Sequence, residues 1–123
     1  MGDETMRTDN TGPDEYDLIA AAREKRRADW AGDLAAFLDL PPVLARHIVH
    51  EPTGEALAIT CKAAYLGRAA FSVLAVLAAR EEMLPAHALY ARLDQFEAVG
   101  RAEAIDTLNL WREQGALPGL AAA

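Results

Sequence analysis

The stretch from Trp30 to Arg80 restricts the fold of this chain more than any other, because turn-forming residues divide it into short apolar segments. The breaks fall at residues 40–42 (Leu-Pro-Pro), 51–54 (Glu-Pro-Thr-Gly) and 66–68 (Leu-Gly-Arg). Proline and glycine end helices, and proline also suits the first turn of the next helix, so four short helices are predicted here. The last of them, residues 69–79, is apolar on nearly every face, which is typical of a buried helix. The stretch therefore predicts a compact all-α core in which residues 69–79 form a central helix wrapped by the others.

Helical signals continue on both sides of this stretch. Acidic residues from Asp14 and basic residues up to Arg27 fit the two ends of one helix dipole, and Asp29 suits the N-cap of the next helix. Pro85 begins another helix that Gly100 ends, and a last helix is followed by Gly115 as its C′ residue, with Pro118 just beyond. No stretch alternates apolar and polar residues with period two, so no sheet is expected. The predicted fold class is all-α, a bundle of about six to seven short helices.

The spacing of apolar residues also predicts which side chains face the core. One helix before residue 51 presents Val43, Leu44, His47 and Ile48, and the helix at 53–65 presents Leu57, Cys61, Ala64 and Tyr65. Toward the C-terminus the inward residues are Leu89, Leu93 and Phe96, then Ile105, Leu108 and Trp111.

Length and composition indicate one domain. The chain has 123 residues, of which 52% are apolar, enough for one core at residues 14–118. Residues 1–13 are polar and acidic and are predicted to be a disordered tail, as are residues 119–123. The single cysteine, Cys61, favours a reducing compartment. The longest apolar run, 69–79, is too short for a membrane span, and no secretory signal is visible, so a cytoplasmic location is predicted.

Three segments of the chain resemble a known family. They are D-W-A-G-D-L-A-A-F-L-D-L-P at 29–41, H-E-P-T-G-E-A-L-A at 50–58, and the small-residue turn before 69–71. Together, over about residues 29–80, they resemble an alphaproteobacterial family of all-helical proteins known only as a domain of unknown function. The resemblance implies a HEAT-like or orthogonal helical module of stacked short helices. Members are often longer, so this chain looks like one terminal module, and the family supplies no catalytic residues.

Two histidines and a cysteine raise the possibility of a metal site. His47 and His50 are three residues apart and can share a helix face, with Glu51 adjacent and Cys61 on the next helix. A zinc or iron site needs three or four ligands converging at about 2.0–2.3 Å, and spacing fixes at most two of them here. We therefore predict no metal and no cofactor, with a half-buried His47, a helix-terminal His50 and an apolar role for Cys61.

A nucleic-acid site is the second possibility. The one local positive cluster is Arg23, Lys25, Arg26 and Arg27, but acidic residues follow directly, and the helix at 53–65 offers only Lys62 as a base. A recognition helix presents several basic or amide side chains, and the net charge of −7 repels phosphate. Nucleic-acid binding is therefore not the favoured reading.

The sequence contains no residue pattern that is typical of a catalytic site. Glu81 and Glu82 and the acids after residue 90 lie among bases on faces that are predicted to be exposed, whereas general acid–base pairs need a desolvated cleft. Neither a phosphate-binding glycine loop nor a nucleophile or zinc-protease motif is present. The sequence therefore favours a chain that is not an enzyme.

The preferred hypothesis is a noncatalytic helical protein–protein interaction module, a small cytoplasmic adaptor or regulator. An acidic surface favours a basic partner protein, and no membrane contact is expected. Exposed aromatic residues dominate interface energies, which makes Trp111, Tyr90 and Trp30 the interface candidates, with Tyr65 as a fourth. The competing interpretation, which is favoured for most of them, is a place in the core. Homodimerisation fits this hypothesis too. The alternatives are a domain that senses a small ligand or metal near His47, and a DNA-binding regulator.

Overall fold

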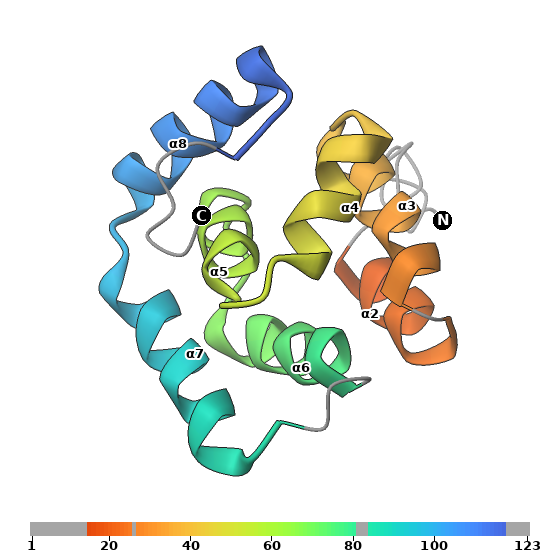
Figure 1. Cartoon of the computed structure of the whole chain (residues 1–123), viewed down its shortest axis with the longest axis vertical. Coiled ribbons are helices and arrows are strands. Elements are labelled where there is room, and N and C mark those ends of the chain that lie inside the picture. The colour runs from red at the N-terminus through yellow and green to blue at the C-terminus, as the bar shows by residue number, and fades with distance from the viewer. Residues whose placement is uncertain (1–14, 26, 81–83, 118–123) are drawn as a thin grey trace, which may run out of the picture.

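The computed structural model describes residues 15–25, 27–80 and 84–117, and its helices confirm the all-α prediction (Figure 1). No strand occurs in these residues. Several features named above lie outside the described residues: the predicted tails at 1–13 and 119–123, Pro118, and the Glu81-Glu82 pair. The seven helices of this part are α2 (Glu15–Glu24), α3 (Arg27–Leu38), α4 (Pro42–His50), α5 (Glu55–Ala63), α6 (Arg68–Ala79), α7 (Ala86–Ala98) and α8 (Arg101–Gln114).

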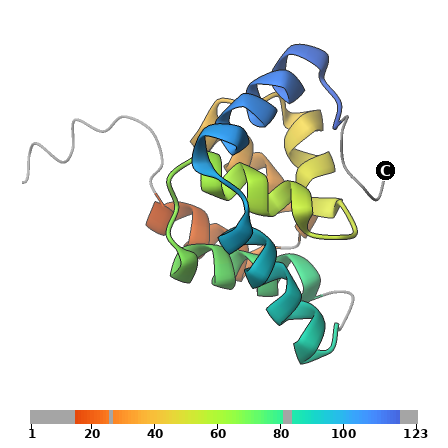
Figure 2. The ribbon, with the colours of Figure 1, turned by 90° about the vertical axis from the view of Figure 1, so that its left-hand side faces the viewer.

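The helix at the centre of the bundle is α5. It packs against α4, α6, α7 and α8, and every residue from Ala56 to Cys61 is buried. Helices α2, α3 and α4 lie on one side of it and α7 and α8 curve around the other (Figure 1). Turned by a quarter, the molecule shows the link between α7 and α8 crossing in front of α5 (Figure 2). The short, alanine-rich α5 is therefore the wrapped element of the fold.

The prediction that residues 69–79 form the central, wrapped helix is wrong. Helix α6 packs on α2, α5 and α7 through Phe71, Leu74 and the buried alanines, but its opposite face is open. Val76 is 49% exposed, and Val73 and Leu77 are only half-buried. Burial of an apolar helix is favourable on all of its sides. In α6, however, the described helices of this chain cover only one side.

Two helices end in a left-handed turn although no glycine stands at the turn position. Asp39 follows α3 with φ 56° and Tyr65 follows α5 with φ 65°, both in the left-handed region. The N–H of Leu40 then donates to the Ala35 carbonyl (2.9 Å) and that of Leu66 to the Cys61 carbonyl (3.1 Å), as in a Schellman ending. Tyr65 is 68% exposed because it lies in this turn, so its predicted place in the core stripe is wrong.

Other helix ends agree more closely with the sequence. Pro42 opens α4, and Gly115 follows α8 with φ 67°, its N–H donating to the Trp111 carbonyl at 2.7 Å. Both predictions are confirmed. Asp29, by contrast, is not the N-cap of α3, because the helix already begins at Arg27 and Asp29 lies in its first turn.

The buried face of α4 is turned by one residue from the prediction. Its buried residues are Leu44, Ala45, Ile48 and Val49, whereas Val43 is 54% exposed and His47 is exposed. Ala45 is small enough for α4 to approach its neighbours closely, which brings the 45/49 side of the helix inward. Val43 and His47 therefore face out, contrary to the prediction.

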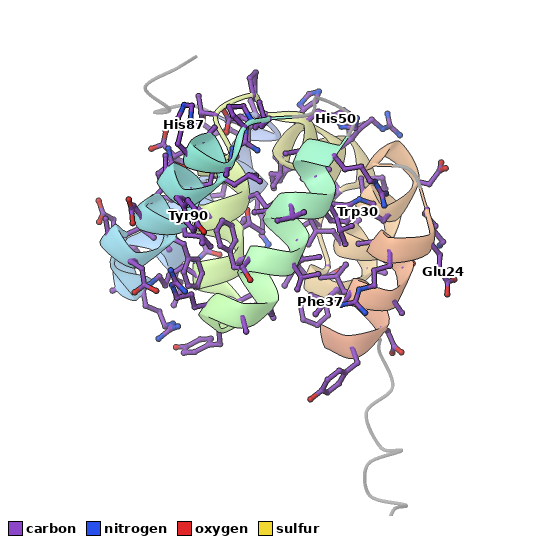
Figure 3. All side chains as sticks on the ribbon, turned by 90° about the horizontal axis from the view of Figure 1, so that it is seen from below. Glu24, Trp30, Phe37, His50, His87 and Tyr90 are labelled. Atoms are coloured by element: carbon purple, nitrogen blue, oxygen red, sulfur yellow. The ribbon has the colours of Figure 1, made fainter. Side chains whose placement is uncertain are left out.

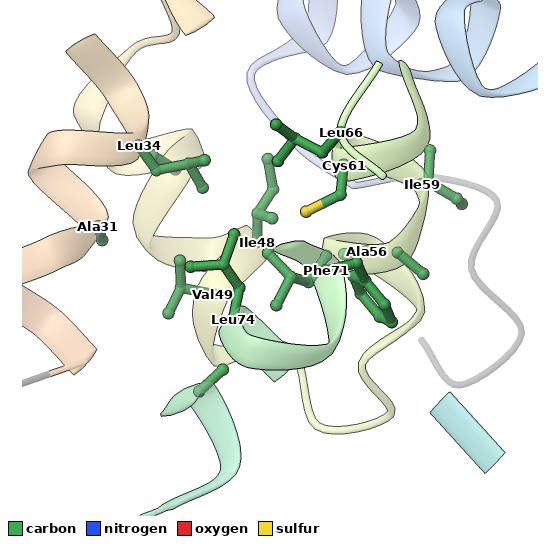
Figure 4. Packing of buried hydrophobic residues seen from close by; sticks show 14 of the residues in the cluster. Ala31, Leu34, Ile48, Val49, Ala56, Ile59, Cys61, Leu66, Phe71 and Leu74 are labelled. Atoms are coloured by element: carbon green, nitrogen blue, oxygen red, sulfur yellow. The ribbon is translucent and has the colours of Figure 1, made fainter. Parts of the chain in front are cut away.

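The core is one continuous cluster of buried apolar side chains that spans the described helices. Phe71 of α6 stacks on Phe96 of α7 with ring centroids 4.7 Å apart, and Cys61 lies among aliphatic residues (Figure 4). Leu93, Phe96, Leu108 and Trp111 take the inward places predicted for them.

Arginine side chains tie helices that are distant in the sequence. Arg80 donates to the carbonyls of Ala22 (3.2 Å) and Lys25 (2.6 Å) at the end of α2. Arg101 donates to the Lys62 carbonyl of α5 (3.2 Å), and Arg112 to the Leu38 carbonyl of α3 (2.8 Å). The last carbonyls of a helix lack partners within it and lie at the negative end of its dipole. Each arginine therefore satisfies a helix end from another part of the fold.

Candidate functional site

The predicted interface residues fall into two groups. Trp30 and Trp111 are both 0% exposed, so neither is a surface anchor, and their large rings fill the core, in agreement with the inward place predicted for Trp111. Tyr90 is 65% exposed on α7 and remains available to a partner (Figure 3). Tyr65 is exposed as well, but its ring lies under the Arg101 guanidinium at 4.6 Å.

The three metal candidates do not converge. His47 is exposed, Cys61 is buried in the core, and the Nδ1–H of His50 donates to the Arg46 carbonyl at 2.9 Å. Within residues 15–25, 27–80 and 84–117 no group of three or more His, Cys, Asp or Glu side chains is placed to hold a metal ion. The arrangement therefore gives no support to metal sensing at these residues.

The basic residues near the end of α2 are partly engaged. Lys25 Nζ lies 2.9 Å from Asp33 Oδ2, and this hydrogen bond and the Asp33 charge raise the pKa of Lys25. Lys62, the base predicted on the next candidate helix, lies over the ring of Phe96 at 4.3 Å. Arg26 and the side chain of Arg27 are outside the described part of the structure. The DNA-binding hypothesis gains no support from these contacts.

The open face of α6 is the first surface with the properties of an interaction site. We call Ser72, Val73, Val76 and Leu77 the α6 stripe; they line a shallow hollow of about 260 Å³. The Ser72 hydroxyl donates to the Ala69 carbonyl at 2.8 Å, so its polar group is satisfied within the helix and the stripe is effectively apolar.

Tyr90 is an exposed aromatic residue on α7, the helix that packs next to α6. Arg68 pairs with Glu97 (2.9 Å) and Phe71 stacks on Phe96, so the first turn of α6 lies against the last turns of α7. Figure 3 shows Tyr90 on the face where α6 crosses the centre of the view. Apolar side chains and exposed tyrosines are residue types that are enriched at the centres of protein interfaces.

A cleft of about 420 Å³ is the second candidate surface, and it lies where α5, α7 and α8 meet. Its lining includes Glu55 and Ile59 of α5, Gln95 and Val99 at the end of α7, and Glu103 and Thr107 of α8. The buried Trp111 also borders it. None of the described lining residues is basic. The cleft therefore combines two carboxylates with an apolar wall.

The loop between α4 and α5 holds the walls of this cleft in place. Glu51 accepts hydrogen bonds from the N–H groups of Ala56 and Thr53 (both 2.9 Å) and from the Thr53 hydroxyl (2.6 Å). Burial raises the pKa of Glu51, but these hydrogen bonds and the charge of Arg92 lower it more, so its pKa lies below the ordinary 4.5. Glu51 thus fixes the first turn of α5, where Glu55 begins the cleft.

Arg92 connects the same loop to α7. Its side chain is only 7% exposed, and Nη2 donates to the Pro52 carbonyl at 2.7 Å. Gly54 has φ +80°, and a Cβ added there would lie 2.6 Å from Arg92 Cδ. Only glycine lets the arginine pass so close. The motif at residues 50–58 is therefore explained by structure: a carboxylate cap, a carbonyl for Arg92 and a glycine beneath it.

Sequence reasoning missed both surfaces. The signal for the α6 stripe was present, since 73, 76 and 77 are apolar at helical spacing in a segment too apolar for its own covering. The cleft had no local signal, because its α5 wall lies about 40 residues before the α7 and α8 walls in the chain. Only packing brings Glu55, Gln95 and Glu103 together.

Comparison with known families shows what the chain is related to. Residues 5–109 match the family described as "Uncharacterised protein conserved in bacteria (DUF2336)". The chain belongs to this family. The match confirms the resemblance to an uncharacterised bacterial domain family and extends it beyond residues 29–80. The alphaproteobacterial and HEAT-like details stay predictions.

Other comparisons add no named relative. No match was found among curated proteins or among solved structures. In the part of the chain that the structure describes, no helix is both long and apolar enough to cross a membrane.

Proposed function

We propose that this DUF2336 member is a noncatalytic helical protein–protein interaction module, a small adaptor or regulator of the cytoplasm. The observation that carries the proposal is the α6 stripe: one side of a helix built from core-type residues has no cover within the described chain. Contiguous exposed apolar surface on a small domain marks an interaction site, because leaving it in water is unfavourable.

The stripe docks the apolar face of another protein. Tyr90 on the neighbouring helix α7 supplies a rigid exposed aromatic, with a hydroxyl that can hydrogen-bond to water or to the partner. Arg68 and Glu97 form an ion pair at the edge, which gives the surface the apolar centre and polar rim of a protein interface. The cytoplasmic assignment is supported by the unbridged, buried Cys61.

The test uses two valines of similar exposure on different helices. Val76→Asp places a charge in the stripe, while Val43→Asp, on the far helix α4, is the matched control, since the two side chains are 49% and 54% exposed. Proteins bound to the tagged chain are quantified by mass spectrometry after capture from nuclease-treated cytosol of the source bacterium. A partner retained by Val43→Asp and reduced at least tenfold by Val76→Asp is expected.

Tyr90 has a control of its own. Tyr16, on α2, is 77% exposed against 65% for Tyr90. We expect Tyr90→Ala to weaken the same partner by about 1–2 kcal/mol, or roughly five- to thirtyfold, and Tyr16→Ala to leave it unchanged. Light scattering of the purified chain shows whether a second copy is the partner. A partner that binds all four variants alike contradicts the proposal.

A further inference from the structure

We infer that the α6 stripe is covered by the α6 stripe of a second copy of this chain, with the two helices packed antiparallel about a two-fold axis. The inference rests on the proposed function, because it names the partner of the same surface. It can nonetheless fail alone, since a monomeric chain can still bind a different protein through α6.

The charge of α6 is compatible with a copy of itself. No acidic residue occurs in Arg68–Ala79, and no charged residue lies between Arg68 and Arg80. Both arginines are already engaged, Arg68 with Glu97 (2.9 Å) and Arg80 with the carbonyls at the end of α2. Two chains with a net charge of −7 repel each other wherever acidic surfaces meet. The uncharged stripe lets two copies meet without that repulsion, and it offers a basic protein no carboxylate to recognise.

The side chains of the stripe suit helix-to-helix packing. Ser72, Val73, Val76 and Leu77 share one face of α6 at spacings of three and four residues, and the exposed Ala69 continues this face. All five side chains are short, so the axes of two such helices can approach to about 8–10 Å. The Ser72 hydroxyl already donates to the Ala69 carbonyl at 2.8 Å, so its burial would leave no donor unpaired.

The antiparallel arrangement follows from symmetry and from the helix dipole. In a two-fold interface, a contact of residue i with residue j of the second copy occurs twice. With the axis at the centre of the stripe, Val73 faces Val76 of the second copy, and Ser72 faces Leu77. The positive end of one α6 dipole then lies at the negative end of the other, whereas a parallel pair would bring like ends together.

Concentration-dependent self-association is the first test. One helix face from each chain is a small interface, so we expect a dissociation constant on the order of tens of micromolar. Sedimentation equilibrium of the full chain between about 1 μM and 1 mM should show the mean mass rising from one chain toward two. Val76→Asp is expected to stay at the mass of one chain, while Val43→Asp, of similar exposure on α4, should behave as wild type.

Salt distinguishes this dimer from one that is held by opposite charges. Screening weakens the repulsion between two acidic chains, so the dimer should be at least about twofold tighter in about 0.5 M than in about 0.05 M sodium chloride. Clear weakening by salt would overturn the uncharged stripe as its interface.

Mixed variants test whether stripe faces stripe. The two Val76 positions lie within one helix turn of each other across the axis, so Val76→Asp and Val76→Arg each bring like charges together. An equal mixture of the two variants is expected to associate at least about tenfold more tightly than either alone, because opposite charges now meet. A mixture of Val43→Asp and Val43→Arg is the control and should match wild type.

Disulfide formation tests the orientation. In the antiparallel pair the two copies of Ala69 are about 16 Å apart along the helices, whereas the two copies of Val76 are close. Val76→Cys is therefore expected to cross-link on mild oxidation and Ala69→Cys is not, while the buried Cys61 takes no part. Cross-linking at 69 in preference to 76 would overturn the antiparallel arrangement.

Two other results separate the failure of this inference from that of the proposed function. A wild type that is monomeric at about 1 mM overturns the second copy as the partner, even if Val76→Asp still loses a protein captured from cytosol. A dimer that Val76→Asp does not weaken, or a Val76 mixture that gains nothing, overturns the stripe as the dimer interface.

Discussion

Glu51 shows how one carboxylate can hold a helix end. It accepts three hydrogen bonds at the start of α5, and its pKa lies below 4.5 because these bonds outweigh the effect of burial. A carboxyl whose pKa is lower in the folded than in the unfolded state stabilises the fold above its unfolded pKa. That contribution is lost as the pH falls through the folded pKa. We therefore expect Glu51→Gln to cost about 1–2 kcal/mol at pH 7.

The pH dependence separates this cap from a packing effect. Because glutamine cannot titrate, the difference in unfolding free energy between wild type and Glu51→Gln should shrink between pH 7 and pH 3. Urea denaturation followed by circular dichroism at several pH values measures it. Glu24→Gln, an exposed glutamate of α2, is the control and should differ little from wild type at any pH. A difference that stays constant down to pH 3 would mean that the Glu51 charge is not what stabilises the loop.

At the scale of elements, the contact between the α4–α5 loop and α7 holds together the helices that line the cleft. Gly54 adopts φ +80° directly against the Arg92 side chain. Gly54→Ala adds both backbone strain and a clash at 2.6 Å, so we expect a loss of about 2–4 kcal/mol in stability. Thermal and urea denaturation measure this loss.

Gly115→Ala is the matched control for this joint. Gly115 has φ +67°, but nothing lies within 4 Å of a Cβ added there. Its substitution by alanine therefore measures only the cost of the left-handed backbone conformation, about 1 kcal/mol of unfolding free energy. If the two alanine variants lost the same stability, the close passage of Arg92 would not matter. Gly67→Ala, with negative φ and open space, should be nearly neutral.

At the scale of the whole molecule, Cys61 reports how cooperatively the bundle opens. It is 0% exposed on the central helix α5, which packs on four others. A thiol there reacts only when the core opens, because a reagent has no path to it in the folded state. We expect native labelling by a chromogenic disulfide to be at least about a hundredfold slower than in urea.

The same experiment has a clear counter-result. Labelling should accelerate in Gly54→Ala in proportion to its loss of stability if opening is global. Rapid labelling of the native wild type would show that α5 becomes accessible by a local motion, and the view of one cooperative core would be wrong.

Element boundaries could be predicted because their causes are local. Pro42 and Gly115 act through their own backbone torsions, so the start of α4 and the end of α8 were visible in the sequence. The exceptions are Asp39 and Tyr65, where residues other than glycine took the left-handed conformation. Their turns are stabilised by hydrogen bonds that a residue-by-residue reading of preferences does not see.

Local sequence was thus sufficient for an all-helical chain and for most helix ends, since these depend on neighbours within about four residues. It was not sufficient for which helix is central or which face of α4 is buried. Those outcomes depend on contacts such as Arg112 with Leu38 and Arg80 with Ala22, which are 74 and 58 residues apart. The α6 stripe and the acidic cleft belong to the same class, because each exists only where packing leaves a surface uncovered or brings three helices together.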